Sequence, residues 1–303
     1  MQTSACRPGL LTGIALVLIL GCGSPAGAGP SDSAPIPVVA STNVYGDVVE
    51  RIGADKVDVV SIITDPAQDP HSYEASTRNQ LELSEAEVVV QNGGGYDDFV
   101  GRMLRSAENS SADVIDVVEV SGKSPDAAGE FNEHLWYDFP TMAKLADRVA
   151  AALAEAAPAD AAVFRDNATS FKDELTSLTS ETERIKADHA GAAVAVTEPV
   201  PLYLIEASGL RNLTPPDFSE AVEEGDEVSP SSLQATIALF TDARVEALVY
   251  NEQTTGPQTD KVKKAAEDNG VPVVPVTETL PQGEDYIGWM TANVDGLESA
   301  LDR

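Results

Sequence analysis

The stretch TMAKLADRVAAALAEAAPADAAVFRDNATSFKDELTSLTSETERIKADH, residues 141–189, decides how this chain folds. It is rich in Ala, Leu, Glu and Lys, which are good helix formers. Pro158 interrupts it, which predicts one helix ending at Ala156 and a second from about Ala159 to Ala187. In the second helix, apolar side chains recur at helical spacing and predict a core-facing stripe: Phe164, Phe171, Leu175 and Leu178. At ~1.5 Å per residue, this helix is long enough to run across the body and connect two lobes.

On both sides of this tract, short apolar runs alternate with amphipathic stretches, which is the pattern of an α/β architecture. The first such unit covers roughly residues 36–120 and the second roughly residues 191–303. Within the second unit, residues 211–225 are expected to form a loop, because they hold Pro215-Pro216 and an acidic run. Ser229-Pro230 is expected to open a helix, with Ser229 as the N-cap. The two units share the same rhythm of strand and helix without a close sequence repeat.

The N-terminus is typical of a targeting segment. Arg7 precedes an apolar run, residues 10–20, which is shorter than the ~20 residues of a membrane span. The run ends in Ile19-Leu20-Gly21-Cys22, which resembles a bacterial lipobox, so we expect Cys22 to be lipidated. An ordinary secretory signal with a chance cysteine is the alternative. Because Cys6 lies before the expected cleavage point, the mature chain has no internal disulfide.

Composition extends the domain prediction to the whole chain. The segment after the cysteine is rich in Gly, Pro, Ser and Ala, which predicts a flexible tether. The predicted organisation is a signal peptide at 1–21, the lipidated cysteine and tether at 22–35, an N-terminal α/β lobe at 36–140, linking helices at 141–190, and a C-terminal α/β lobe at 191–303.

The chain is strongly acidic, with 50 Asp and Glu against 19 Lys and Arg and a formal net charge of −31. This balance argues against nucleic-acid binding and against a face that binds anionic lipid. An acidic surface attracts cations, but it is more often simply a solvated surface with no partner.

Four polar residues follow predicted strands, where open α/β sheets bind their ligands. His71 lies in the phrase Asp69-Pro70-His71-Ser72-Tyr73-Glu74, and His134 in Asn132-Glu133-His134-Leu135-Trp136-Tyr137-Asp138. Glu198 and Glu278 each follow a predicted strand of the second unit. Imidazole is a common metal ligand, and these side chains would share a cleft between two lobes. Alternatively, each carboxylate is a solvated loop residue or a charge at a helix N-terminus.

Taken together, the two histidine phrases, Asn92-Gly93 and Thr197-Glu198-Pro199 give the chain its resemblance to a known family. The chain resembles the solute-binding lipoproteins of bacterial manganese and zinc ABC importers, which include the so-called adhesin lipoproteins. The resemblance covers essentially the whole mature chain. It implies two Rossmann-like lobes joined by one rigid helix, with the metal site in the cleft between the lobes. It also implies an extracytoplasmic protein, anchored to the cell membrane, that delivers metal to a cognate ABC permease.

The resemblance implies one Mn²⁺ or Zn²⁺ per chain as the transported ligand, held by His71, His134, Glu198 and Glu278. The fourth ligand is usually Asp in this family, so Glu252, after the strand that ends at Tyr250, is the alternative to Glu278. Zinc members often carry a His-rich loop before the second histidine, and residues 121–132 contain no histidine. The absence of that loop favours manganese, or zinc proteins that lack the loop. We expect a monomer.

Two other functions compete with metal transport. An extracellular metallohydrolase would need an open coordination position and a general base, but no His-Glu-x-x-His or similar phrase is present. A binder of a larger chelate, such as a siderophore or a corrinoid, would need a cleft rich in aromatic residues and Arg. Aromatic residues make up only 5% of this chain, so metal transport without catalysis remains the favoured prediction.

Overall fold

The computed structural model describes residues 1–5, 34–65, 68, 73, 76–124 and 131–303. Residues 35–303 form one compact unit, and residues 1–34 are a separate one. The fold below is that of the compact unit. His71 and Cys22, two residues singled out from the sequence, lie outside the described residues.

The first sheet has four parallel strands in the order β2-β1-β3-β4. Strand β1 has the sequence IPVVAST and is buried along nearly its whole length, as expected for a strand covered on both faces. The four strands are β1 (Ile36–Thr42), β2 (Val57–Ile63), β3 (Val88–Gln91) and β4 (Asp113–Asp116). The helices of this part are α1 (Asn43–Gly53), α2 (Thr77–Glu85), α3 (Asp98–Ala107) and α4 (Val117–Ser121), with 3₁₀ turns at η1 (Ala54–Lys56) and η2 (Leu135–Tyr137).

The second sheet repeats this topology, with four parallel strands in the order β6-β5-β7-β8. The rhythm shared by the two sequence units therefore corresponds to one strand order used twice. The strands are β5 (Ala193–Val196), β6 (Arg211–Asn212), β7 (Ala247–Asn251) and β8 (Val273–Val276). The helices are α7 (Leu202–Ala207), α8 (Pro216–Glu223), α9 (Pro230–Thr241), α10 (Pro257–Asp268) and α11 (Tyr286–Leu301).

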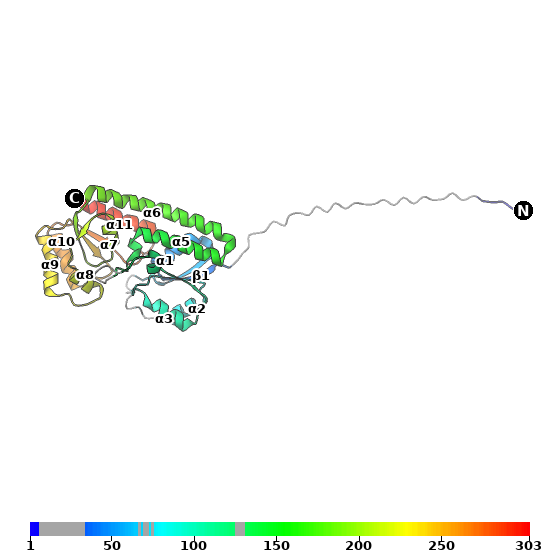
Figure 1. Ribbon diagram of the computed structural model, residues 1–303, viewed down its shortest axis with the longest axis horizontal. Helices are drawn as coiled ribbons and strands as arrows, with labels where there is room; N and C mark the ends of the chain where they lie inside the picture. Colours follow the sequence, from blue (N-terminus) through cyan, green and yellow to red (C-terminus); the bar gives the residue numbers. More distant parts are fainter. Residues whose placement is uncertain (6–33, 66–67, 69–72, 74–75, 125–130) are drawn as a thin grey trace. The chain divides into compact units, whose positions relative to one another are not determined.

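The tract between the sheets forms two helices separated at Pro158, as predicted. They are α5 (Phe139–Ala156) and α6 (Ala161–His189), with a 3₁₀ turn, η3 (Pro158–Asp160), between them. Helix α6 packs against α1 and α5 beside the first sheet and against α7 and α11 beside the second (Figure 1). The predicted stripe of apolar residues on α6 is buried. A long helix that links two α/β lobes is therefore confirmed.

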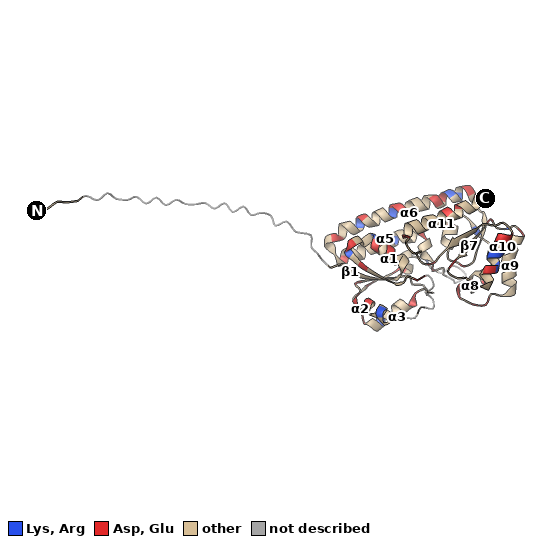
Figure 2. Cartoon of the chain, turned by 180° about the vertical axis from the view of Figure 1, so that it is seen from behind, with Lys and Arg blue, Asp and Glu red and all other residues tan. Residues whose placement is uncertain are grey.

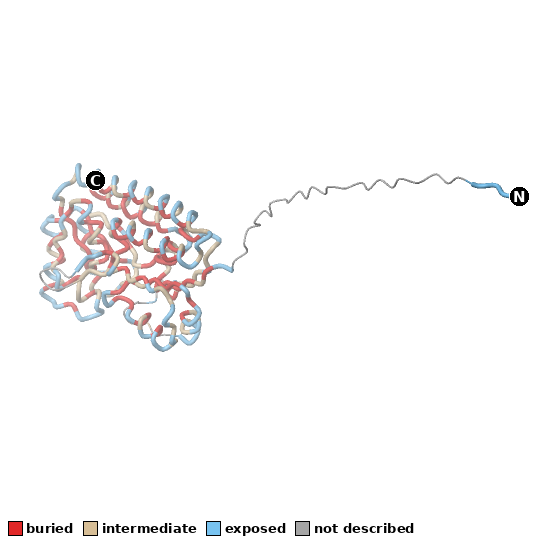
Figure 3. Tube along the Cα trace, turned by 45° about the vertical axis from the view of Figure 1, so that its right-hand side comes forward, coloured by how far each residue is buried: buried red, intermediate tan, exposed pale blue. Residues whose placement is uncertain are grey.

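One hydrophobic cluster includes residues of both sheets and of α5, α6 and α11. Figure 3 shows this burial running along the strands and the inner sides of the helices, with exposed residues outside. Smaller clusters lie on the other face of each sheet. Because the main cluster crosses from one sheet to the other, the two lobes share part of their core around the linking helix.

The prediction of a loop over residues 211–225 is wrong in its centre, where the structure has helix α8. Pro216 occupies the first turn, where its missing N–H costs nothing. Phe218 and Val222, one helical turn apart, are buried and hold the helix against the second sheet's cluster. The helix therefore forms because two apolar residues find a core, although its other positions are mostly polar. The N-cap prediction is confirmed, since Ser229 Oγ accepts from the N–H of Ser232 at 3.1 Å.

Charge is distributed over the helices, where Asp and Glu outnumber Lys and Arg (Figure 2). In the part of the chain that the structure describes, no helix combines the length and the apolar character needed to cross a membrane.

Candidate metal centre

Two buried or half-buried carboxylates at the edge of the second sheet accept hydrogen bonds from the same side-chain amide. Glu198 follows the end of β5 and is 2% exposed, and Glu278 follows the end of β8. Asn251, the last residue of β7, lies between them. Its Nδ2 donates to Glu198 Oε2 and, at 2.8 Å, to Glu278 Oε1. Because the three strands are parallel neighbours or next neighbours, their carboxyl ends bring these side chains to one edge.

The loop that carries Glu278 is fixed by a second amide. Gln253 Oε1 accepts from the N–H groups of Glu278 and, at 2.9 Å, of Thr279, and Gln253 Nε2 donates to Thr279 Oγ1 at 2.7 Å. Glu252, the alternative fourth ligand, directly follows β7 and is exposed. Its exposure favours Glu278 over Glu252 as the inward carboxylate.

His134 is buried, with 1% exposure, at the residue that precedes the turn η2. Asn132 Oδ1 lies 2.7 Å from His134 Nδ1 and also accepts from the backbone N–H of His134 at 3.1 Å. The other ring nitrogen, Nε2, lies 3.4 Å from Glu223 Oε1. Glu223 is the last residue of α8, so a carboxylate of the second lobe faces the histidine of the first.

The carboxylates around His134 are close enough to disturb one another. Burial raises the pKa of Glu223 to about 9, and the negative charges of Glu133, Glu198 and Glu278 add to the rise. Burial, followed by repulsion from Glu224 and Glu278, raises the pKa of Glu133 to about 7. Mutual repulsion of buried carboxylates is what a bound cation would relieve. The electrostatics of this edge therefore favour a cation.

Aromatic rings surround the histidine. The ring centroids of Trp136 and Tyr96 lie 5.1 Å and 6.2 Å from that of His134. Both aromatic side chains are buried. Packing on this side places the imidazole in a low-dielectric environment, where charge interactions are strengthened.

Several hydrogen bonds join the His134 segment to the carboxylate loops of the second lobe. Asn132 Nδ2 donates to the carbonyl oxygen of Pro199, the residue after Glu198, at 3.1 Å. Tyr137 Oη donates to the carbonyl oxygen of Thr277, the residue before Glu278, at 2.8 Å. The segment that carries the histidine therefore contacts both loops that carry carboxylates.

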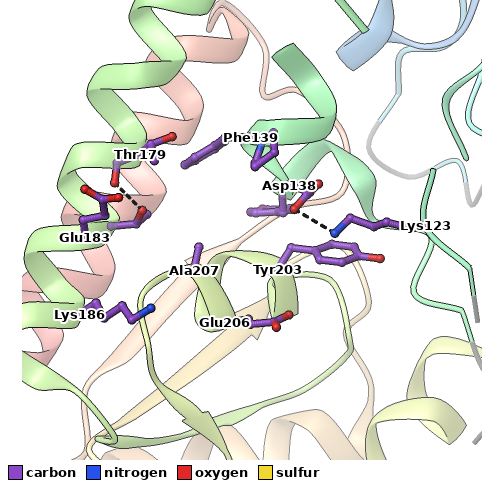
Figure 4. A pocket seen from close by; sticks show the side chains of 12 residues that line it. Lys123, Asp138, Phe139, Thr179, Glu183, Lys186, Tyr203, Glu206 and Ala207 are labelled. Atoms are coloured by element: carbon purple, nitrogen blue, oxygen red, sulfur yellow. Dashed lines mark hydrogen bonds and ion pairs between the residues drawn. The ribbon is translucent and has the colours of Figure 1, made fainter. Parts of the chain in front are cut away.

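A cavity of about 320 Å³ lies at this junction, between α6, α7 and the start of α5. Figure 4 shows Lys123 beside Asp138 and the ring of Tyr203. The Lys123 amino group lies 3.3 Å from Asp138 Oδ1 and 4.6 Å from the centroid of the Tyr203 ring, which is a cation–π distance. Tyr203 Oη in turn donates to the carbonyl oxygen of Asn132 at 2.7 Å.

Of the predicted ligands, Glu198 and Glu278 are brought together and His134 lies beside Glu223, whereas His71 lies outside the described residues. Among the described residues, no three His, Cys, Asp or Glu side chains form a preassembled metal cluster. Sequence reasoning missed Glu223, Asn132 and Asn251. The acidic run that ends at Glu223–Glu224 was the only signal for the first.

The Asn92-Gly93 phrase has a structural role in the first lobe. Asn92 is fully buried, its Oδ1 accepts from Tyr45 Oη, and its N–H and that of Gly93 donate to the Asp97 carboxylate at 2.6 and 2.9 Å. Gly93 has φ +79°, a backbone conformation that favours glycine. These bonds shape the turn after β3.

The donor set fits a divalent transition metal. Asn132 Nδ2 faces a carbonyl oxygen and must be the donor end of the amide, so Oδ1 faces His134 and Nδ1 carries the ring proton. Nε2 is then the nitrogen with a lone pair, 3.4 Å from a carboxylate oxygen. Two donor atoms each ~2.1 Å from one ion and ~109° apart lie ~3.4 Å from each other. One metal ion can therefore bind both.

The family model of the zinc-uptake complex component A, described as periplasmic, matches residues 38–300. The chain belongs to this family. Over 98% of its length the chain is 22% identical to the manganese ABC transporter substrate-binding lipoprotein scaA of Streptococcus gordonii, of which 99% is covered. Over 57% of both proteins it is 31% identical to the manganese-binding lipoprotein MntA of Bacillus subtilis.

The fold is also that of solved members of the zinc-uptake family. The periplasmic zinc-binding protein TroA of Treponema pallidum superposes with a TM-score of 0.74 at 20% identity, covering 89% of this chain and 100% of TroA. Of the two sequence relatives, scaA is named as a substrate-binding lipoprotein of a manganese ABC transporter and MntA as a manganese-binding lipoprotein. The predicted family, fold class and non-enzymatic role are confirmed.

Proposed function

We propose that this protein captures Mn²⁺ or Zn²⁺ outside the cytoplasm and delivers the ion to a cognate ABC permease. The observation that carries the proposal is the meeting of Glu198 and Glu278 at Asn251, in loops that contact the His134 segment. The Nε2 atom of His134 also lies 3.4 Å from a carboxylate oxygen of Glu223. Carboxylate and imidazole donors suit manganese and zinc. The names of the relatives support the same two metals.

The proposed ligands are His71, His134, Glu198 and Glu278, with one ion per chain. His71 enters from the family resemblance alone. Glu223 adds a third carboxylate, because its Oε1 lies at ligand-to-ligand distance from His134 Nε2. Two imidazoles and three carboxylates give six donor atoms when one carboxylate binds through two oxygens, a coordination number that manganese accepts. We therefore propose manganese as the cargo, although zinc is expected to bind at least as tightly in solution because of its position in the divalent series.

Metal analysis of the purified protein tests the proposal. Protein isolated from unsupplemented medium and analysed by mass spectrometry for metals is expected to contain one divalent ion per chain, either manganese or zinc. Light scattering after gel filtration is expected to give the mass of a monomer. A chain that carries no transition metal, and takes up none from added Mn²⁺ or Zn²⁺, would contradict the proposal.

Lipid anchoring through Cys22 is a separate proposal. Cys22→Ala is expected to release the protein from the membrane into the surrounding fluid, because the variant lacks the cysteine that would carry the acyl anchor. Stable anchoring needs more than one acyl chain, and the variant carries none at residue 22, so release from the membrane should be nearly complete. Detergent partitioning of the mutant and the wild type measures it, and equal membrane retention would contradict the lipobox.

A further inference from the structure

Asn132 makes four contacts that span the two lobes. Its Oδ1 faces both the backbone N–H and the Nδ1 of His134, at 3.1 and 2.7 Å. Its Nδ2 donates to the Pro199 carbonyl oxygen at 3.1 Å, and its own carbonyl oxygen accepts from Tyr203 Oη at 2.7 Å. One side chain thus contacts a metal-site histidine of the first lobe and the carboxylate loop of the second.

The two ends of the Asn132 amide have different roles. The Oδ1 end fixes the proton on Nδ1 and leaves Nε2 for the metal, in the way that outer hydrogen bonds orient histidine ligands. The Nδ2 end reaches the residue directly after Glu198. Because the amide is planar and rigid, the position of the Glu198 loop and the orientation of the imidazole are mechanically linked.

From these contacts, we propose that Asn132 is a positioning residue that couples separation of the lobes to reorientation of His134, and hence to release of the metal. The inference rests on the metal-binding function proposed above. When the second lobe moves away, its Pro199 carbonyl oxygen pulls on Nδ2 of Asn132 through their hydrogen bond. The side-chain amide then rotates, and Oδ1, the atom that holds the imidazole of His134, moves with it. Closure restores both bonds at once, so His134 and Glu198 become aligned together.

The surroundings of Asn132 allow such a movement. Tyr203, which binds the Asn132 carbonyl, forms one wall of the cavity of about 320 Å³ beside α6 (Figure 4). Lys123 of the first lobe packs over the Tyr203 ring of the second at 4.6 Å. The lobes share an apolar core around the linking helix. The contacts of Asn132, Tyr203 and Lys123 across the junction, by contrast, are polar or cation–π contacts next to open volume, and such contacts can break and re-form.

Three variants separate the two roles of the amide. Asn132→Ala removes both ends. Asn132→Asp keeps an acceptor for His134 and removes the donor to Pro199. Tyr203→Phe removes a different bond between the lobes and leaves the Asn132 side chain intact, so it is the matched control.

The first measurement is the tautomer of His134 in the metal-free protein, read from the ¹⁵N shifts of its imidazole. With only three histidines in the chain, the spectrum is simple to assign. Wild type, Asn132→Asp and Tyr203→Phe are expected to show the Nδ1–H form, and Asn132→Ala a mixture. A pure Nδ1–H form in Asn132→Ala would overturn the positioning role, whatever the metal affinity.

The second measurement is metal binding by competition with a chelator, together with the rate of metal loss to excess chelator. Asn132→Ala is expected to bind Mn²⁺ and Zn²⁺ about 10- to 100-fold more weakly, the usual effect of losing an outer hydrogen bond. Asn132→Asp is expected to lose metal several-fold faster than wild type. Its added negative charge would by itself slow the loss of a cation, so faster loss must come from the broken link to Pro199.

The outcomes distinguish this inference from the proposed function. A wild-type rate of metal loss in Asn132→Asp would overturn the coupling. If the Asn132→Asp and Tyr203→Phe variants lose metal equally fast, the effect is general loosening of the junction and the coupling is overturned as well. A wild type that binds neither Mn²⁺ nor Zn²⁺ would instead refute the proposed function, and the tautomer measurement would still decide the orientation of His134.

Discussion

Metal at a hundredfold excess over its dissociation constant is expected to raise the free energy of unfolding of the wild type by ~2.7 kcal/mol. His134→Ala is expected to lose most of this gain, because it removes Nε2, the ring nitrogen that carries the lone pair when Asn132 holds the proton on Nδ1. His71→Ala is expected to behave in the same way if the second imidazole is a ligand. Thermal unfolding with and without Mn²⁺ or Zn²⁺ measures the gain.

His189→Ala is the matched control for the histidine variants. His189 ends α6 and pairs with Asp302 at 3.2 Å, so its loss should leave the metal-induced gain unchanged. His134 is buried, and its replacement is also expected to lower the stability of the metal-free protein. The decisive quantity is therefore the difference that metal makes in each variant. If both His71→Ala and His134→Ala kept the full difference, the metal would bind elsewhere.

Most of the fold follows from local pattern. The strands at residues 57–63 and 273–276 and the closing helix at residues 286–301 belong to the strand and helix rhythm that predicted the two α/β units. These elements combine continuous apolar runs or helical spacing with clear boundaries, such as the Asp285 cap that accepts from the Gly288 N–H at 2.7 Å. Helix α8 was missed because only two of its apolar positions, Phe218 and Val222, form its buried face, and Pro215-Pro216 reads as a turn.

The site was less accessible to sequence reasoning than the fold. His134, Glu198 and Glu278 could be proposed from the sequence because each follows a strand or lies in a family phrase. The partners Asn132, Asn251 and Glu223 depend on which loops the two sheets bring together, and no local spacing encodes that. Asn251, for example, bridges carboxylates 53 and 27 residues away in the chain. Amides and carboxylates at such positions look like ordinary polar loop residues until the lobes are placed.

Glu278→Asp and Glu278→Ala are both expected to lower the ratio of manganese to zinc affinity. Manganese needs more oxygen donors than tetrahedral zinc, so each lost or shortened carboxylate weakens manganese more. For Glu278→Ala we expect a fall in the ratio of about tenfold, which corresponds to ~1.4 kcal/mol. Glu223→Gln is expected to act in the same direction, since it replaces a carboxylate oxygen 3.4 Å from His134 Nε2 with a weaker donor.

Competition with a chelator of known strength, carried out separately for the two metals, gives the ratio for each variant. Glu224→Gln and Glu252→Gln are the controls, because each removes one negative charge from an exposed side chain next to Glu223 or near Glu278. If the controls lower both affinities equally and leave the ratio unchanged, the effect of Glu223 and Glu278 is that of ligands and not of net charge. An unchanged ratio in both Glu278 variants would remove Glu278 from the shell, and a changed ratio in Glu252→Gln would assign the fourth ligand to Glu252. An unchanged ratio in Glu223→Gln, with both affinities intact, would show that Glu223 only neighbours the histidine.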